Sequence, residues 1–202
     1  MSASNGVFLV VLACGAGFFA LNVQRLVRYM RLGQSDPRWD HPLVRVKNLL
    51  TIGIGQQKIF RDSVAGPMHA AIFWGFMVLT AGTVEILAQG VFSGFSFALI
   101  LPDPVYKLYA FSQDSFAVLV IGAVGFALYR RLFVHPKRLE GDNLEHTDAL
   151  IILGMIGGLM VTLLFANACA YLVDPSSVGP EKPASRALAA VIAPLSAHPA
   201  AG

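Results

Sequence analysis

Four long apolar blocks constrain this sequence more than any other feature. They run from Gly6 to Val23, Pro67 to Gln89, Tyr106 to Tyr129 and Ala149 to Val173. Each holds about 18–25 residues, the length that an α-helix needs to cross the hydrocarbon core of a bilayer. Backbone polar groups inside a bilayer must pair within their own segment, so the blocks predict membrane-spanning helices. The predicted fold class is an all-α membrane protein with four transmembrane helices in residues 1–173.

The composition agrees with this class. Apolar residues make up 55% of the 202 residues and charged residues only 13%, whereas a soluble domain usually carries about 25% charged residues. The apolar residues are grouped in blocks rather than spread periodically. This grouping indicates helices in lipid and excludes a globule built around one large core.

The distribution of basic residues predicts the orientation of the helices. Segment Arg25–Ala65 holds eight Lys or Arg residues and segment Arg130–Asp148 holds four, while Lys107, Lys182 and Arg186 fall on the opposite side. Because basic loops favour the cytoplasmic side, both termini are expected outside. The expected location is the inner membrane of a bacterial cell. The net charge of +3 is explained by this orientation and by anionic lipid, so no nucleic-acid partner is expected.

Between the first two blocks the apolar residues recur at helical spacing. They are Leu43, Val46, Leu50 and Ile54. This pattern predicts an amphipathic helix over about 42–60 that lies in the cytoplasmic membrane interface. Two glycines inside the segment favour the alternative, an irregular loop. At the other end of the chain, residues 174–202 are rich in Pro, Ala and Ser, which predicts an external tail or linker with a short apolar patch at Arg186–Leu195.

His69 is the first polar residue of interest at membrane depth. Pro67 suits the first position of a helix, because its missing N–H is not needed there, and this places His69 in the first turn. Polar side chains inside a membrane are costly and are functional candidates by default. The imidazole either bonds a neighbouring helix or ligates a haem iron through one ring nitrogen. Arg61, just before the helix, pairs either with haem propionates or with lipid.

His146 stands just before the fourth block, on the same side as His69 and at roughly the same depth. Two hypotheses remain for it. It is either the second axial ligand of a bis-histidine haem site or a solvated cap of the fourth helix.

Glu85 and Asp114 form a second group. Glu85 lies sixteen residues beyond His69, which is about 24 Å along a helix, and Asp114 lies about two turns into the third helix from the outside. Both are therefore expected in the outer leaflet. Carboxyl groups there could exchange protons with a quinone. The alternatives are snorkelling to the interface for Glu85 and an interhelical hydrogen bond for Asp114.

Several stretches of the chain resemble a known family. They are KIFRDSVAGPMHAAIFWGFMVLTAGTVEIL, LYAFSQDSF, LYRRLFVHPKRLE and DALIIL, between about Leu26 and Tyr171. They look like the membrane part of heterodisulfide-reductase-related iron–sulfur oxidoreductases, which resemble electron-transfer-flavoprotein:menaquinone oxidoreductases. That membrane part is similar to the gamma subunit of respiratory nitrate reductase, a b-type cytochrome.

The resemblance implies a function in a respiratory chain. Electrons would pass between a cytoplasmic iron–sulfur domain and menaquinone through haem b, with His69 as an axial ligand. Where the gamma subunit has a second histidine ten residues further on, this chain has Leu79. Electron transfer flavoprotein is a further expected partner.

The family also has a fifth helix and a cysteine-rich domain. This chain stops at Gly202 without them, and its two cysteines, Cys14 and Cys169, are far apart. We therefore expect the [4Fe–4S] clusters in a missing part of the chain or in a separate polypeptide. Two other hypotheses stay open: a haem-free membrane anchor for an iron–sulfur partner, and a small proton-coupled transporter that uses Glu85 and Asp114.

Overall fold

The structure is a computed structural model that describes residues 3–33, 40–92, 94–134 and 143–196. Within these residues it is built from helices and contains no strand. Four helices are long and apolar enough to cross a membrane: Asn5–Met30, Ala65–Val91, Asp103–Val134 and Thr147–Val173. The predicted all-α class with four membrane-length helices is confirmed, while the orientation of the termini stays a prediction.

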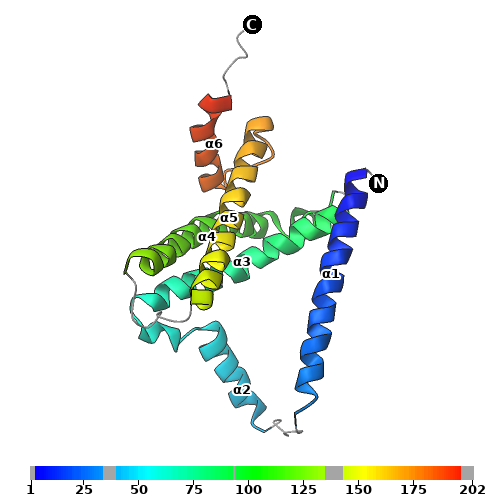
Figure 1. Cartoon of the computed structure of the whole chain (residues 1–202). Helices are drawn as coiled ribbons and strands as arrows, with labels where there is room; N and C mark the ends of the chain where they lie inside the picture. The colour runs from blue at the N-terminus through cyan, green and yellow to red at the C-terminus, as the bar shows by residue number, and fades with distance from the viewer. Residues whose placement is uncertain (1–2, 34–39, 93, 135–142, 197–202) are drawn as a thin grey trace. The chain divides into compact units, whose positions relative to one another are not determined.

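The helices follow one another along the chain (Figure 1). The elements are α1 (Ala3–Met30), α2 (Pro42–Asn48), the π-helical turn η1 (Leu49–Ile54), the short η2 (Ile59–Arg61), α3 (Ala65–Val91), the short η3 (Phe97–Leu99), α4 (Asp103–Tyr129), its π-helical extension η4 (Arg130–Val134), α5 (Asn143–Val173) and α6 (Pro183–Ser196). Prolines stand near the starts of α2, α3, α4 and α6, where a missing N–H breaks no helical bond.

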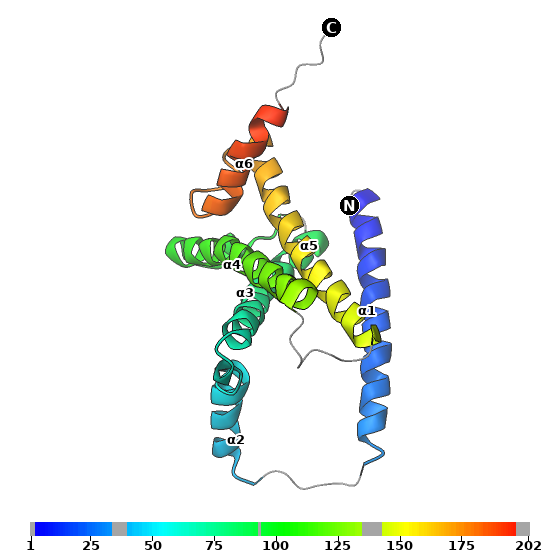
Figure 2. The same cartoon turned by 60° about the vertical axis from the view of Figure 1, so that its left-hand side comes forward.

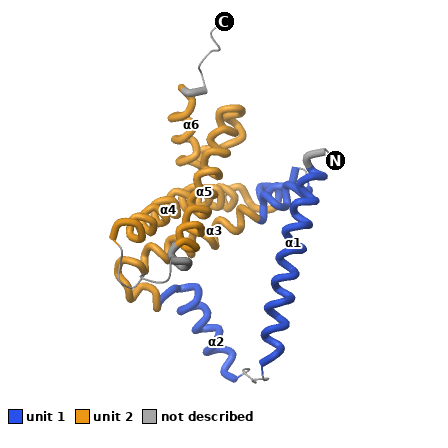
Figure 3. The backbone as a smooth tube through the Cα atoms, viewed as in Figure 1, with its two compact units in different colours: residues 1–57, 84–99 blue, residues 58–83, 100–202 orange. Residues whose placement is uncertain are grey.

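The chain divides into two compact units. Unit 1 contains residues 1–57 and 84–99, and unit 2 contains residues 58–83 and 100–202 (Figure 3). The division falls inside α3, so its first turns belong to unit 2 and its last turns to unit 1. The sequence predicted a single domain over residues 1–173 and did not anticipate this division.

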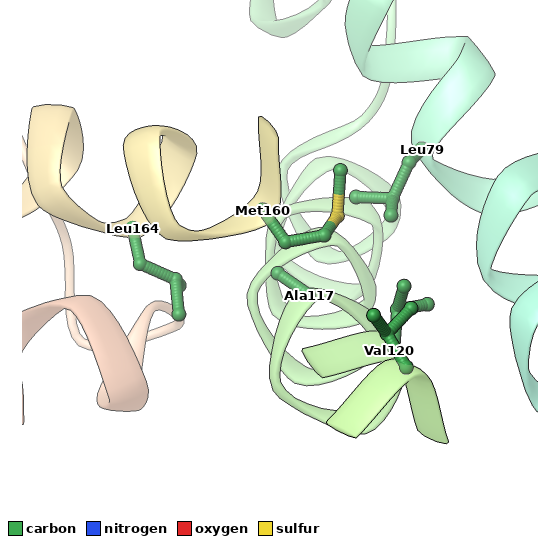
Figure 4. Close-up of a cluster of buried hydrophobic side chains, with 6 residues drawn as sticks. Leu79, Ala117, Val120, Met160 and Leu164 are labelled. Carbon is green, nitrogen blue, oxygen red and sulfur yellow. The ribbon is translucent and has the colours of Figure 1, made fainter. Parts of the chain in front are cut away.

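The core of unit 2 forms where α3, α4 and α5 meet. Its buried members are Leu79, Ala117, Val120, Val124, Met160 and Leu164. Figure 4 shows Met160 of α5 pointing toward Leu79 of α3, with Ala117 of α4 beside them. Ala117 has no exposed surface. A small residue at this crossing lets the helix backbones approach closely, which is how helices associate in lipid.

Glycines bring α3 against α4 within unit 2. A Cβ atom on Gly75 would collide with the side chain of Val120, and one on Gly82 would lie 2.6 Å from Oε1 of Gln113. The amide of Gln113 donates to the carbonyl oxygen of Val78 at 2.6 Å. A side chain at Gly75 would push against the branched side chain of Val120, and one at Gly82 would displace the amide of Gln113.

Unit 1 has one comparable contact. The ring of Phe8 in α1 occupies the space that a Cβ atom on Gly90 of α3 would need. Most other side chains of α1 are exposed, including Phe18 and Phe19. An apolar surface of this extent suits a helix that faces lipid rather than water.

The segment after Val173, predicted as a linker, contains the helix α6. Figures 1 and 2 show α6 beside the second half of α5. Ser185 and Ala189 have no exposed surface, and Val178 in the preceding turn is 3% exposed. Composition alone indicated a linker because the segment is rich in Pro, Ala and Ser. The helix is stabilised by contacts with residues far away in the sequence.

The segment predicted as an amphipathic interfacial helix is helical over α2 and η1 and therefore shorter than the predicted 42–60. The chain leaves it through Gln56, which has a left-handed φ of 54°. The glycines that favoured a loop lie at the end of the segment. A Cβ atom on Gly55 would lie 2.6 Å from the carbonyl oxygen of Thr51, so the absence of a side chain at Gly55 permits the end of the π-helical turn.

Candidate functional site

The first turn of α3 is fixed by Asp62, just before the helix, and by Gly66 at its start. Asp62 Oδ1 accepts hydrogen bonds from the backbone N–H groups of Val64 at 3.1 Å and Ala65 at 2.9 Å. Its carbonyl accepts the N–H of Gly66 at 2.9 Å. These bonds satisfy amide groups that the start of a helix leaves unpaired.

Gly66 completes this arrangement. It is buried, and a Cβ atom there would press against the backbone of Ile59 and Phe60. Only glycine therefore lets η2 lie against the start of α3. Pro67 follows in the first turn, as expected. The segment FRDSVAGPMH thus forms a hydrogen-bonded, closely packed entry into α3, and His69 follows it in the first turn of the helix.

His69 is exposed in the described part of the chain. Phe76 and Thr80, which follow it on the same face of α3, are exposed as well, because residues seven and eleven positions apart lie nearly one above the other. Among the described residues none forms a hydrogen bond with the imidazole. An imidazole at membrane depth that faces lipid leaves its ring nitrogens unpaired. We therefore expect a group from another element or molecule to bind the His69 imidazole on this face of α3.

The structure describes the other two haem-binding candidates only in part. Arg61 ends η2 and is exposed. His146 belongs to the first turn of α5, but its side chain lies outside the described residues, as does all of His135 and His198. The predicted pairing of His69 with His146 is therefore neither supported nor contradicted.

Asp114 is 2% exposed and accepts hydrogen bonds from the start of α6. Its Oδ2 accepts the N–H of Ala184 at 2.6 Å, and its Oδ1 accepts the N–H of Ser185 at 3.2 Å and the hydroxyl of Ser185. The carboxylate thus acts as the N-cap of a helix seventy residues further along the chain. A charged acceptor at a helix N-terminus is also favoured by the helix dipole.

Further contacts hold α6 along α5. Lys182 Nζ donates to Asn167 Oδ1 at 3.3 Å, and the Arg186 guanidinium lies 5.1 Å from the ring centre of Tyr171. In the turn between the helices, the hydroxyl and the N–H of Ser176 donate to Asp174 and lower the pKa of its carboxyl.

Glu85 is 7% exposed and has a similar role within unit 1. Its Oε1 accepts the hydroxyl of Ser96 at 2.9 Å and the N–H of Phe97 at 2.8 Å, at the start of η3. Both carboxylates proposed for proton exchange are therefore buried and already accept hydrogen bonds from backbone amides.

Sequence analysis missed several residues that build these sites. Asp62 and Gly66 belong to the most specific stretch of the family resemblance, and an Asp shortly before an apolar helix is a known capping signal. Ser185 gave no signal, because its partner lies 71 residues away. Gln113 is a polar candidate beside Asp114 in the sequence, but its bond to Val78, 35 residues away, was not predicted. Cys14 is exposed and Cys169 partly buried. In the described ranges no three His, Cys, Asp or Glu side chains gather as a metal site.

The fold and these sites define a membrane protein of four long helices whose capped entry into α3 presents a histidine. The comparisons point to oxidoreductases. This chain is 30% identical over 162 residues to the probable iron–sulfur-binding oxidoreductase FadF of Bacillus subtilis, which aligns with 80% of this chain and 22% of that protein.

The match establishes a distant relationship to an iron–sulfur-binding oxidoreductase. The chain spans about a fifth of the length of this curated relative. No family model matches the chain, and no solved structure matches it.

Proposed function

We propose that this chain is the membrane electron-transfer module of a quinone-linked iron–sulfur oxidoreductase. It would carry electrons between a cytoplasmic iron–sulfur domain and menaquinone through haem b. The observation that carries the proposal is His69, exposed on a membrane-length helix in a chain related to an iron–sulfur-binding oxidoreductase.

The residues around His69 fit a haem on one side. The open face of α3 offers an imidazole nitrogen as axial ligand, and the exposed ring of Phe76 could pack against a flat apolar macrocycle and exclude water. The capped helix entry at Asp62 would hold the imidazole in a fixed direction. A bound haem would supply one-electron transfer in the membrane. Arg61 would pair with its propionates.

The second axial ligand is proposed to come from outside the described residues. The histidines whose side chains are described are His41 and His69, and His41 lies in the segment before α2 rather than in a membrane-length helix. A helix of the longer protein, or of a partner subunit, would supply the ligand in preference to His146. The iron–sulfur domain and electron transfer flavoprotein are proposed as partners on this side of the bacterial inner membrane.

The quinone site has two possible places in this scheme. Glu85 and Asp114 were proposed for proton exchange in the outer leaflet, but both are occupied as acceptors of hydrogen bonds. Glu85 is also about 24 Å from His69 along α3. A site in the half of the membrane that contains His69 and Arg61 avoids both difficulties, and we favour it.

The haem ligand is tested in the assembly of this chain with its iron–sulfur partner. The His69→Ala variant should lose the reduced b-type absorption spectrum, whereas the His41→Ala variant should keep it. A normal spectrum in a folded His69→Ala assembly would reject the ligand. The absence of a Soret band in the wild-type assembly would favour a haem-free anchor, and substrate-driven proton flux in liposomes would favour a transporter.

The place of the quinone site is tested with the same assembly. Glu85→Gln and Asp114→Asn should leave quinone-linked turnover close to wild type at temperatures where the variants are folded, and Arg61→Gln should slow it. Slow turnover in both carboxyl variants with an intact haem spectrum would return the site to the outer leaflet.

A further inference from the structure

The helical segment formed by α2 and η1 exposes an apolar surface that no described residue covers. Leu43 is 84% exposed, Val46 52% and Leu50 54%, and α2 has no buried residue. With about 100° per residue, these three side chains fall within an arc of about 60° on one face. Leu49 lies at the edge of the same face and is 61% exposed.

The opposite side of the segment is mostly polar. Lys47 and Thr51 lie at one border of the apolar face, and Asn48 and Arg45 lie beyond it, with Val44 and Ile52 as apolar exceptions. Arg45 Nη2 forms an ion pair with Asp40 at 2.6 Å, and both side chains are exposed. An apolar face bordered by basic residues is typical of a helix that lies in a membrane interface.

The π-helical turn keeps this face together. Gly55 N–H donates to the carbonyl of Leu50 at 2.7 Å, which closes a ring one residue wider than in an α-helix. A π-helix has more than four residues per turn, so Ile54 points in nearly the same direction as Leu50 and Val46. The apolar face therefore continues to the end of η1.

The connectivity of the chain keeps the segment near the bilayer. The helices α1 and α3 are consecutive membrane-length helices, so the end of α1 and the start of α3 lie on the same side of the membrane. Only the ten residues 55–64 separate η1 from α3, a reach of at most about 35 Å. This side is the one with the basic residues, where anionic lipid is enriched.

We propose that α2 and η1 form a lipid-binding surface for the anionic leaflet. Leu43, Val46, Leu50 and Leu49 insert among acyl chains, and Arg45 and Lys47 bind phosphate groups of anionic lipid. Lipid is favoured over a protein partner for two reasons. The face is aliphatic and lacks the aromatic anchors that protein interfaces use, and its basic border complements an anionic surface. The proposal does not depend on haem or quinone.

Spin labels on the full chain test this surface. In a chain whose Cys14 and Cys169 are replaced by Ala, single cysteines are placed at Leu50 or at Asn48, and the protein is inserted into lipid discs rich in phosphatidylglycerol. The label at Leu50 should be accessible to oxygen and shielded from a water-soluble nickel complex, and the label at Asn48 should show the reverse. Equal nickel accessibility at the two positions would overturn the proposal.

The lipid chemistry is tested in the same discs. Each basic residue near an anionic surface shifts binding roughly fivefold, so Arg45→Gln together with Lys47→Gln should raise the nickel accessibility of the Leu50 label. Discs of phosphatidylcholine alone should have the same effect. If Leu50 is shielded only after the iron–sulfur partner is added, the surface binds protein and the lipid assignment is wrong.

Discussion

At the scale of single residues, the buried carboxylates of Asp114 and Glu85 accept hydrogen bonds from backbone amides. Asp114 caps α6 and Glu85 caps η3. Free N–H groups at helix starts have no water to bind inside a membrane, so a nearby acceptor is needed. This need gives both acidic residues a structural role at membrane depth, and their part in proton exchange stays a prediction.

Removing the Asp114 carboxylate should release α6. The Asp114→Ala variant leaves the buried N–H and hydroxyl of Ser185 unpaired, which costs about 1–3 kcal/mol. We expect a lower unfolding temperature and faster trypsin cleavage after Arg186, with a smaller effect in Asp114→Asn, which keeps one acceptor oxygen.

The matched control for Asp114 is Asp103→Asn. Asp103 pairs with Lys107 on the surface of α4, at 2.6 Å with both side chains exposed, and such a pair contributes about 0–1 kcal/mol. Its loss should change neither cleavage nor unfolding measurably. The same cleavage rate in Asp114→Ala and Asp103→Asn would contradict the capping role.

The sequence predicted which polar residues lie at membrane depth, but it did not predict the residues with which they form hydrogen bonds. It placed Glu85 and Asp114 among polar groups at membrane depth and included a hydrogen bond to another helix as an alternative for Asp114. It could not identify α6 as that helix, because Ser185 lies 71 residues away. The position of His69 in the first turn of α3 followed from Pro67, a local signal that needs no tertiary contact.

At the scale of helices, small residues decide which faces meet. The four membrane-length helices were predictable because length and hydropathy are local properties, although α3 and α4 begin two or three residues before the predicted blocks. Their contacts were not predictable, since glycines occur on covered and open faces alike. Gly75 faces Val120, whereas Gly122 has no neighbour near the position of a Cβ atom.

These two glycines give opposite predictions for the same substitution. Gly75→Ala should destabilise the α3–α4 contact by about 1–3 kcal/mol, because the added methyl group collides with Val120. Gly122→Ala should be neutral or stabilising by up to about 1 kcal/mol, because alanine favours the helix. Thermal unfolding in one detergent compares them directly. An unfolding temperature lowered equally in both variants would mean that Gly75 is not a contact residue.

At the scale of the whole chain, the placement of each candidate site relative to the cytoplasm depends on the membrane orientation. Twelve of the fifteen Lys and Arg residues lie in segments Arg25–Ala65 and Arg130–Asp148. If these segments are cytoplasmic, His69 lies near the iron–sulfur partner that we propose, and Asp114 and α6 lie near the outer surface. The reverse orientation would separate His69 from a cytoplasmic electron donor.

Thiol labelling of intact cells tests this orientation. In a chain with Cys14 and Cys169 replaced by Ala, a cysteine at exposed Ser63 should resist a membrane-impermeant reagent until the cells are opened. A cysteine at exposed Pro180, between α5 and α6, should react in intact cells. Each position serves as the control for the other, because both cysteines are labelled with the same reagent in the same preparation of cells. Reaction at Ser63 with protection at Pro180 would invert the topology, and would place the open face around His69 on the side of the membrane away from a cytoplasmic iron–sulfur domain.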